Sequence, residues 1–209
     1  MEKPEVVSLE EWQEVRDELL VAEKEVTRAM DAVAARRRRL PMVEFGGDYV
    51  FESADGPRTL VELFEGRVQL AVYQFMDIGP DAFCGGCTWF TGNVPATGLG
   101  MLGDSGVTWM TVSDMPLAQI QSYQERMGWT VPIVSSRGTS FSRDCGAGGG
   151  FMLTLFLRDG DSVYRTYSTT QRGVDRLVFA NNVLDLAPYG RQQSWEDSPD
   201  GWPQHPTYG

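Results

Sequence analysis

A pair of cysteines directly after a buried strand is the sequence feature that most restricts how this chain can fold. Residues 70–76 form the apolar run LAVYQFM, which is typical of a buried strand, and the motif Cys84-Gly85-Gly86-Cys87 follows after a short loop. The segment after the two cysteines can begin a helix, and the first N–H groups of a helix have no partner within it. Those groups favour a thiolate on Cys84, and one helical turn brings Cys87 next to it. The spacing therefore predicts a dithiol that exchanges with disulfides.

The charge and the cysteine content limit the classes of partner and the compartment. The 209 residues carry a net charge of −11, which argues against a nucleic-acid or anionic-membrane surface. The first residues, MEKPEVVSLEEW, lack the basic and apolar regions of a signal peptide, and no apolar run reaches the roughly 20 residues of a membrane-spanning helix. Three cysteines form no disulfide framework, because the count is small and odd. We therefore expect a cytoplasmic protein without membrane or nucleic-acid partners.

A long helix is predicted over residues 8–39. Ser8 can cap its N-terminus, Glu11 completes a capping box, and Pro41 ends the helix. The acidic start of the helix and the run Arg36–Arg39 at its end both complement the helix dipole. Apolar residues recur at alternating steps of three and four, namely Trp12, Val15, Leu19, Ala22, Val26, Ala29 and Val33. This seam can pack on its own domain or on a second chain, and we expect it to make a homodimer contact.

The rest of the chain alternates between strands and helices. Strands are expected at residues 49–52, 69–76, 106–113, 131–134, 151–157 and 163–167. Helical segments are expected at 60–64, 88–103 (short or broken by glycine and proline), 115–127 and 174–186, with a loop at 135–150. The alternation predicts an α/β fold with a mixed central sheet and helices on both faces. We expect three parts: a helical extension at 1–41, a main domain at 42–188 and an aromatic and proline-rich tail at 189–209.

Several motifs resemble one known family. They are the arginine run followed by Leu40-Pro41-Met42, and the segments YVFESADGPRTLVELFEGRVQLAVYQFM at 49–76, MGW at 127–129, VPIVSS at 131–136, FLRDG at 156–160, VYRTYSTTQRGVD at 163–175 and LDLAPYGR at 184–191. They resemble an uncharacterised thioredoxin-like family of predicted dithiol–disulfide oxidoreductases, over nearly the whole chain. The resemblance implies a thioredoxin-like fold of the redoxin type with a long N-terminal helical extension. It also implies a redox role, without an established substrate.

Two details leave the reaction open. Pro80, Cys84 and Cys87 are spaced like the proline, threonine and cysteine of the peroxiredoxin signature, with Cys87 at the position of the peroxide-attacking cysteine. Typical thioredoxins also have a cis-proline before the strand that faces the dithiol, whereas residues 146–150 contain none. The chain can thus be an exchanger in which Cys84 attacks and Cys87 resolves, or a thiol peroxidase in which Cys87 attacks. A third alternative is a non-catalytic scaffold that dimerises through residues 8–39.

Cys145 is the remaining candidate for the site. It lies in the loop before the strand at 151–157, which in a thioredoxin-like fold approaches the dithiol, so it can be a third redox thiol; the alternative is a packed free cysteine. A metal site has little support, because His205 is the single histidine. We predict Cys84, Cys87 and Cys145 as catalytic residues, with no cofactor and no metal. The expected partners are a disulfide-containing or peroxide substrate and a cellular thiol reductant.

Overall fold

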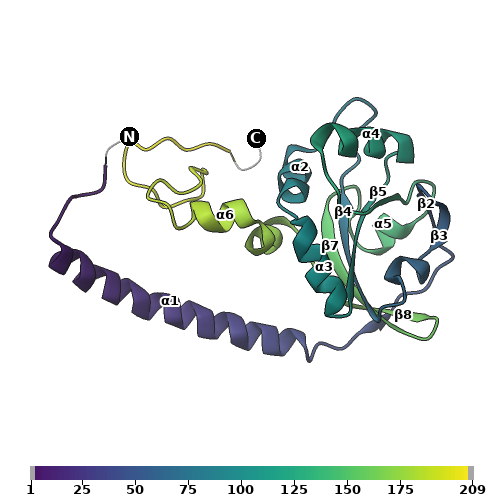
Figure 1. The fold of residues 1–209 in the computed structure, drawn as a ribbon, viewed down its shortest axis with the longest axis horizontal. Coiled ribbons are helices and arrows are strands. Elements are labelled where there is room, and N and C mark those ends of the chain that lie inside the picture. Colours follow the sequence, from purple (N-terminus) through teal and green to yellow (C-terminus); the bar gives the residue numbers. More distant parts are fainter. Residues whose placement is uncertain (1–2, 207–209) are drawn as a thin grey trace.

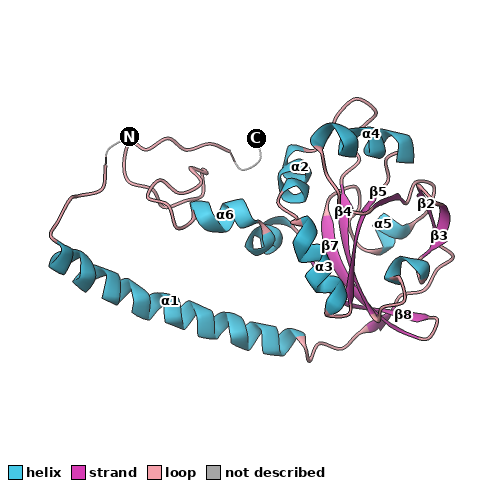
Figure 2. Ribbon diagram, in the orientation of Figure 1, coloured by secondary structure: helices cyan, strands magenta, loops and turns pink. Residues whose placement is uncertain are grey.

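An eight-stranded sheet forms the body of the protein in the computed structural model, which describes residues 3–206. The strand order is β1-β8-β7-β4-β5-β6-β2-β3, and Figure 2 shows α2, α3, α4 and α5 beside the sheet. The strands are β1 Val43–Glu44, β2 Val50–Ser53, β3 Gly56–Thr59, β4 Gln69–Phe75, β5 Val107–Ser113, β6 Ile133–Ser135, β7 Met152–Asp159 and β8 Ser162–Thr169. The α-helices are α1 Leu9–Arg37, α2 Gly85–Gly92, α3 Ala96–Asp104, α4 Leu117–Met127, α5 Phe141–Asp144 and α6 Phe179–Leu184, and the 3-10 segments are η1 Glu62–Phe64 and η2 Gln171–Leu177.

The five central strands have the connectivity of the thioredoxin-like fold in its redoxin version. β4, β5 and β6 run parallel and are joined through helices, whereas β7 lies antiparallel to β4 and forms a hairpin with β8. Tyr73 of β4 pairs with Thr111 of β5 on one side and with Leu153 of β7 on the other. The predicted fold class is confirmed, including the long N-terminal helix.

The two faces of β4 bury two separate cores, because successive side chains of a strand point to opposite faces. Leu70 and Val72 pack in one cluster with Phe51, Phe141 and Phe156. Tyr73 and Phe75 pack in the other cluster, together with Cys87, Phe90, Met115, Ile120 and Tyr123. The second cluster lies under α2 and α4, so the cysteine pair belongs to this face of the sheet.

Helix α1 extends away from the sheet, as Figure 1 shows. The predicted capping box is present: the Glu11 N–H donates to Ser8 Oγ at 3.2 Å, and the Ser8 N–H donates to the Glu11 carboxylate at 3.0 Å. The helix contains no buried residue. None of the helices within residues 3–206 is both long and apolar enough to cross a bilayer.

Two expected segments differ from the structure. The polar stretch at 135–150 is not all loop, because residues 141–144 form α5, and Phe141 is fully buried there. The helix expected at 174–186 is divided into η2 and α6 by Val178, whose backbone is extended. Val174 and Val178 are buried, whereas Leu186 is exposed. The apolar residues of this stretch therefore do not lie on one face of a single helix.

Candidate functional site

The cysteine pair lies where β4 ends and α2 begins. Cys84 is the N-cap residue of α2, with an extended backbone conformation at φ −60° and ψ 119°. Its Sγ accepts a hydrogen bond from the Cys87 backbone N–H at 3.3 Å. A cap residue is the place where a side chain can satisfy a free N–H of the first helical turn. The chain therefore directs the Cys84 sulfur at the positive end of the helix.

This position makes Cys84 the acidic thiol of the pair. A hydrogen bond from the Cys87 side chain, with further hydrogen bonds from the Cys87 and Gly86 backbone, lowers the pKa of Cys84 to about 6 against the opposing effect of burial. The residue is partly exposed. A thiolate that solvent can reach is the reactive form of cysteine. Cys84 thus has the two properties that nucleophilic attack requires.

Cys87 has the opposite environment. It is fully buried, and its hydrogen bond to Cys84 together with burial raises the pKa of Cys87 well above its usual range. The nearby Met76 backbone and Tyr73 side chain lower this pKa in part, without cancelling the rise. Both cysteines are free thiols in this structure. The pair therefore combines a partly exposed cysteine of lowered pKa with a buried cysteine of raised pKa.

An aromatic stack next to Cys84 was not expected from the sequence. The rings of Phe83 and Tyr123 lie 3.6 Å apart between centroids and within 5° of parallel. The Arg126 guanidinium lies over both rings, at 5.2 Å from Phe83 and 4.7 Å from Tyr123. The Tyr123 hydroxyl is 2.8 Å from Thr88 Oγ1, which also donates to the Cys84 carbonyl at 2.8 Å. The stack thus fixes the first turn of α2 to α4.

The Cys84 sulfur has one further close neighbour. Its Sγ lies 3.6 Å from the Met76 Sδ, just past the end of β4. A thioether is apolar and polarisable, so it covers one side of the cysteine without offering a charge. The sequence contained a signal for these neighbours of Cys84. Met76 directly follows the strand, and Phe83 directly precedes the first cysteine.

Cys145 lies on the other face of the sheet. It is 1% exposed and packs in the cluster of Val72 and Phe141, near Thr154 and Gln74. Gln74 follows Tyr73 in β4 and so points away from the face that carries Cys87. Burial raises the pKa of Cys145 to about 12. The structure does not bring Cys145 together with the pair, because β4 lies between them.

The other polar residues near Cys145 also belong to that face. Asp144 accepts a hydrogen bond from the Tyr49 hydroxyl at 2.9 Å. Within residues 3–206 no cluster of three or more histidine, cysteine or acidic side chains could hold a metal ion. His205 lies in the tail, where its backbone N–H donates to the Gln192 carbonyl at 2.6 Å.

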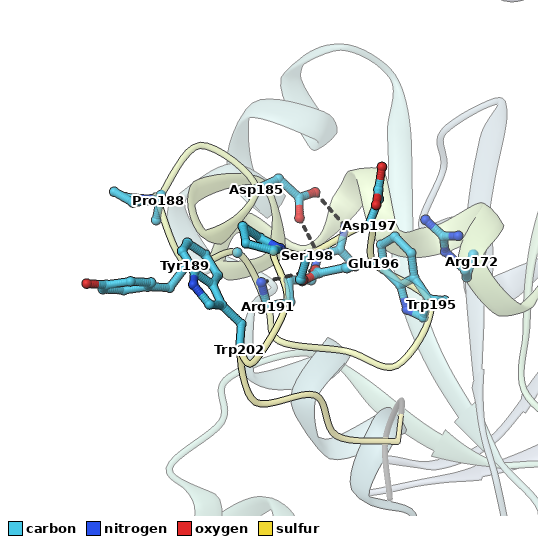
Figure 3. Close-up of a pocket in the computed structure, with 13 residues that line it drawn as sticks. Arg172, Asp185, Pro188, Tyr189, Arg191, Trp195, Glu196, Asp197, Ser198 and Trp202 are labelled. Atoms are coloured by element: carbon cyan, nitrogen blue, oxygen red, sulfur yellow. Dashed lines mark hydrogen bonds and ion pairs between the residues drawn. The ribbon is translucent and has the colours of Figure 1, made fainter. Parts of the chain in front are cut away.

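The tail forms a pocket of its own beside α6. Figure 3 shows Arg191 beside Asp185, which lies 2.6 Å from the guanidinium. Asp175 lies 2.9 Å from the same guanidinium. The cavity has a volume of about 450 Å³, and its wall contains Trp195, which stacks under Arg172. The two carboxylates neutralise Arg191, so this cluster explains how the tail is anchored. A second anchor joins α6 to α2, where the Trp89 indole N–H donates to the Asn181 amide oxygen at 2.9 Å.

Comparison with models of protein families shows to which family the chain belongs. The model of the family described as "Bacterial protein of unknown function (DUF899)" matches residues 1–208. The chain belongs to this family. The match includes α1 and the tail as well as the sheet, in agreement with the resemblance seen in the sequence. None of the curated proteins matches the chain.

Solved structures with a similar arrangement include peroxiredoxins and a disulfide isomerase candidate. A mutant PrxQ from Xylella fastidiosa has a TM-score of 0.45 at 15% identity, covering 68% of this chain and 94% of its own. The peroxidoxin BcpB from Mycobacterium tuberculosis has a TM-score of 0.44 at 14% identity, covering 66% and 92%. A putative protein disulfide isomerase from Bacteroides thetaiotaomicron has a TM-score of 0.46 at 19% identity, covering 68% and 91%.

Proposed function

We propose that this protein is a thiol–disulfide oxidoreductase in which Cys84 attacks and Cys87 resolves. The observation that carries the proposal is the asymmetry of the pair. The Cys84 sulfur is partly exposed and accepts a hydrogen bond from the Cys87 N–H, and its pKa is lowered to about 6, whereas Cys87 is buried and its pKa is raised. Catalytic cysteines are recognised by such a combination of exposure and thiolate character.

The exchange proceeds in two displacements. The Cys84 thiolate attacks one sulfur of a substrate disulfide, which forms a mixed disulfide and releases the other substrate sulfur as a thiolate that takes a proton from water. Cys87 then loses its proton and attacks the Cys84 sulfur, so that the Cys84–Cys87 disulfide forms and the second substrate thiol leaves. The substrate gains two electrons from the dithiol and two protons, one from water and one from Cys87, and the protein is left as the Cys84–Cys87 disulfide. A cellular dithiol reductant returns the pair to the reduced state.

The peroxidase alternative requires Cys87 to meet the peroxide. Its support is the spacing of Pro80, Cys84 and Cys87. Complete burial and a raised pKa both count against Cys87 as the attacking group, since the thiolate is the nucleophile. The exchanger therefore fits the geometry better. We assign Cys145 no part in the exchange, because its thiol packs in the opposite core.

The proposal includes the partners that the sequence indicates. The substrate is a disulfide and the reductant is a cellular thiol, in a cytoplasmic setting where cysteines are kept reduced. We also propose that α1 contributes to a homodimer, because its apolar seam has no buried residue within its own chain.

Two parallel assays test the reaction. The first follows reduction of insulin or of an aromatic disulfide with dithiothreitol as the reductant, and the second follows consumption of hydrogen peroxide. We expect turnover in the first, loss of turnover in Cys84→Ser, and a trapped mixed disulfide in Cys87→Ser. Cys145→Ser is the matched control and should retain turnover. Peroxide consumption that survives Cys84→Ser but not Cys87→Ser would establish the peroxidase instead, and absence of turnover in both assays would favour the scaffold.

A further inference from the structure

Helix α1 carries an apolar stripe that its own chain leaves in solvent. Its large apolar side chains are exposed by 40% to 67%, at Trp12, Val15, Leu19, Val26, Met30 and Val33. They share one side of the helix, because the steps of three and four follow the helical period. Single exposed apolar residues are ordinary, but a contiguous stripe of this length marks a surface that binds another molecule.

A groove lies at the C-terminal end of the same helix. It has a volume of about 670 Å³, and its wall includes Leu153, Leu155 and Leu157 of β7. Its charged lining residues are Arg37, Arg38 and Arg176, and no acidic residue is among the lining. In a chain with a net charge of −11 this is an unusual concentration of positive charge. The groove therefore suits an occupant that is apolar on one side and acidic beside it.

The first half of α1 has this chemistry. Glu11, Glu18 and Glu25 recur every seven residues and so follow one flank of the apolar stripe. Between them, Trp12, Val15 and Leu19 supply apolar side chains for a leucine floor. An amphipathic helix in an apolar groove is a recurring mode of recognition, with anchors at steps of three and four.

We infer that the N-terminal half of α1 from a second copy of this chain occupies the groove. The inference rests on the proposed homodimer and names the surface that receives the helix. Each copy then gives one helix and receives one, so two copies close on each other with both contacts equivalent. A second copy covers the helix stripe and the groove together, whereas a small amphiphile would cover the groove alone.

The size of the contact agrees with a stable pair. Trp12, Val15 and Leu19 expose on the order of 100 Å² each, so three per copy give roughly 600 Å² on two copies, and the groove walls that they cover lose a similar area, for a total of roughly 1,200 Å². Stable interfaces bury about 1,200 to 2,000 Å². The predicted contact lies within this range.

Sedimentation velocity of the full-length protein over a concentration series tests the inference. We expect a dimer whose dissociation constant rises at least about tenfold for Val15→Lys and for Leu19→Lys. Val21→Lys is the matched control, because Val21 is equally exposed but lies on the far side of the helix from the stripe. On the groove side, Arg176→Glu with Leu177→Gln should weaken the dimer similarly, and added salt should weaken the wild type.

Mixing the variants separates helix-in-groove docking from pairing of two helices. The chain with Val15→Lys and Leu19→Lys retains a groove, and the chain with Arg176→Glu and Leu177→Gln retains a helix. We expect the mixture to form a heterodimer through one intact contact. A wild type that is monomeric throughout would overturn the homodimer and the groove assignment together. A dimer that the helix variants abolish and the groove variant leaves unchanged would overturn the groove assignment alone, and neither result depends on the redox assays.

Discussion

The acidity of Cys84 can be tested by removing the group that contributes most to it. The Cys87 thiol is the largest cause of the lowered pKa, so Cys87→Ala should move the pKa of Cys84 up from about 6, by about one unit or more. At pH 7 a thiol with a pKa of 6 is about 90% ionised, against about 1% for the ordinary value of 9.0. A less basic thiolate is also a weaker nucleophile, by roughly 20-fold over three units. The two effects leave a net gain of only about fivefold in rate, so the rate at a single pH is a poor measure.

The midpoint of a pH profile is the better measure. Alkylation of Cys84 by iodoacetamide, followed by mass spectrometry of its peptide from pH 4 to 10, should give a midpoint of about 6 in the wild type. Cys145→Ser should leave this midpoint in place, because Cys145 lies in the other core. A wild-type midpoint of about 8.5 or above, or a midpoint that Cys87→Ala does not move, would refute the reasoning.

Three further predictions concern stability. The pKa of Cys84 falls from 9.0 to about 6 on folding, so between these pH values the unfolded chain binds more protons than the folded chain. The free energy of unfolding of the reduced wild type, measured relative to Cys84→Ser by urea titration, should therefore rise from pH 6 to 9. A difference that does not change with pH would contradict this. Arg191→Ala leaves two carboxylates without their buried partner and should cost on the order of 3 kcal/mol. Hydrogen exchange should then accelerate at residues 185–205 and not in β4; equal acceleration in both would show that the tail is not a separate unit. Tyr123→Phe removes the hydroxyl that lies 2.8 Å from Thr88 and should lower the free energy of unfolding by about 1 kcal/mol, which chemical denaturation measures.

Local patterns in the sequence were sufficient for most of the elements. Ser8 and Glu11 lie three residues apart, and the capping box that this spacing predicts is formed. The strand at 69–76 and the two cysteines after it predicted a thiolate at the N-terminus of a helix. The structure places Cys84 at the N-cap of α2. These features depend on residues within one or two turns of each other, so the sequence alone determines them.

Only the tertiary structure decided what lies on each face of the sheet. Cys145 precedes β7 as expected, yet its thiol is buried against Gln74 and Thr154, away from the pair. The prediction of one helix at 174–186 was wrong, because the backbone of Val178 is extended and separates η2 from α6.

The Phe83–Tyr123 stack joins residues from two separate segments, and no local pattern indicates that they meet. The sequence determined the type and order of most strands and helices, since their periods are short, but not every boundary, as α5 and the division of residues 174–186 show. Pairing between distant strands fixed which side chains share a face, because a shift of one residue would reverse every side chain of a strand.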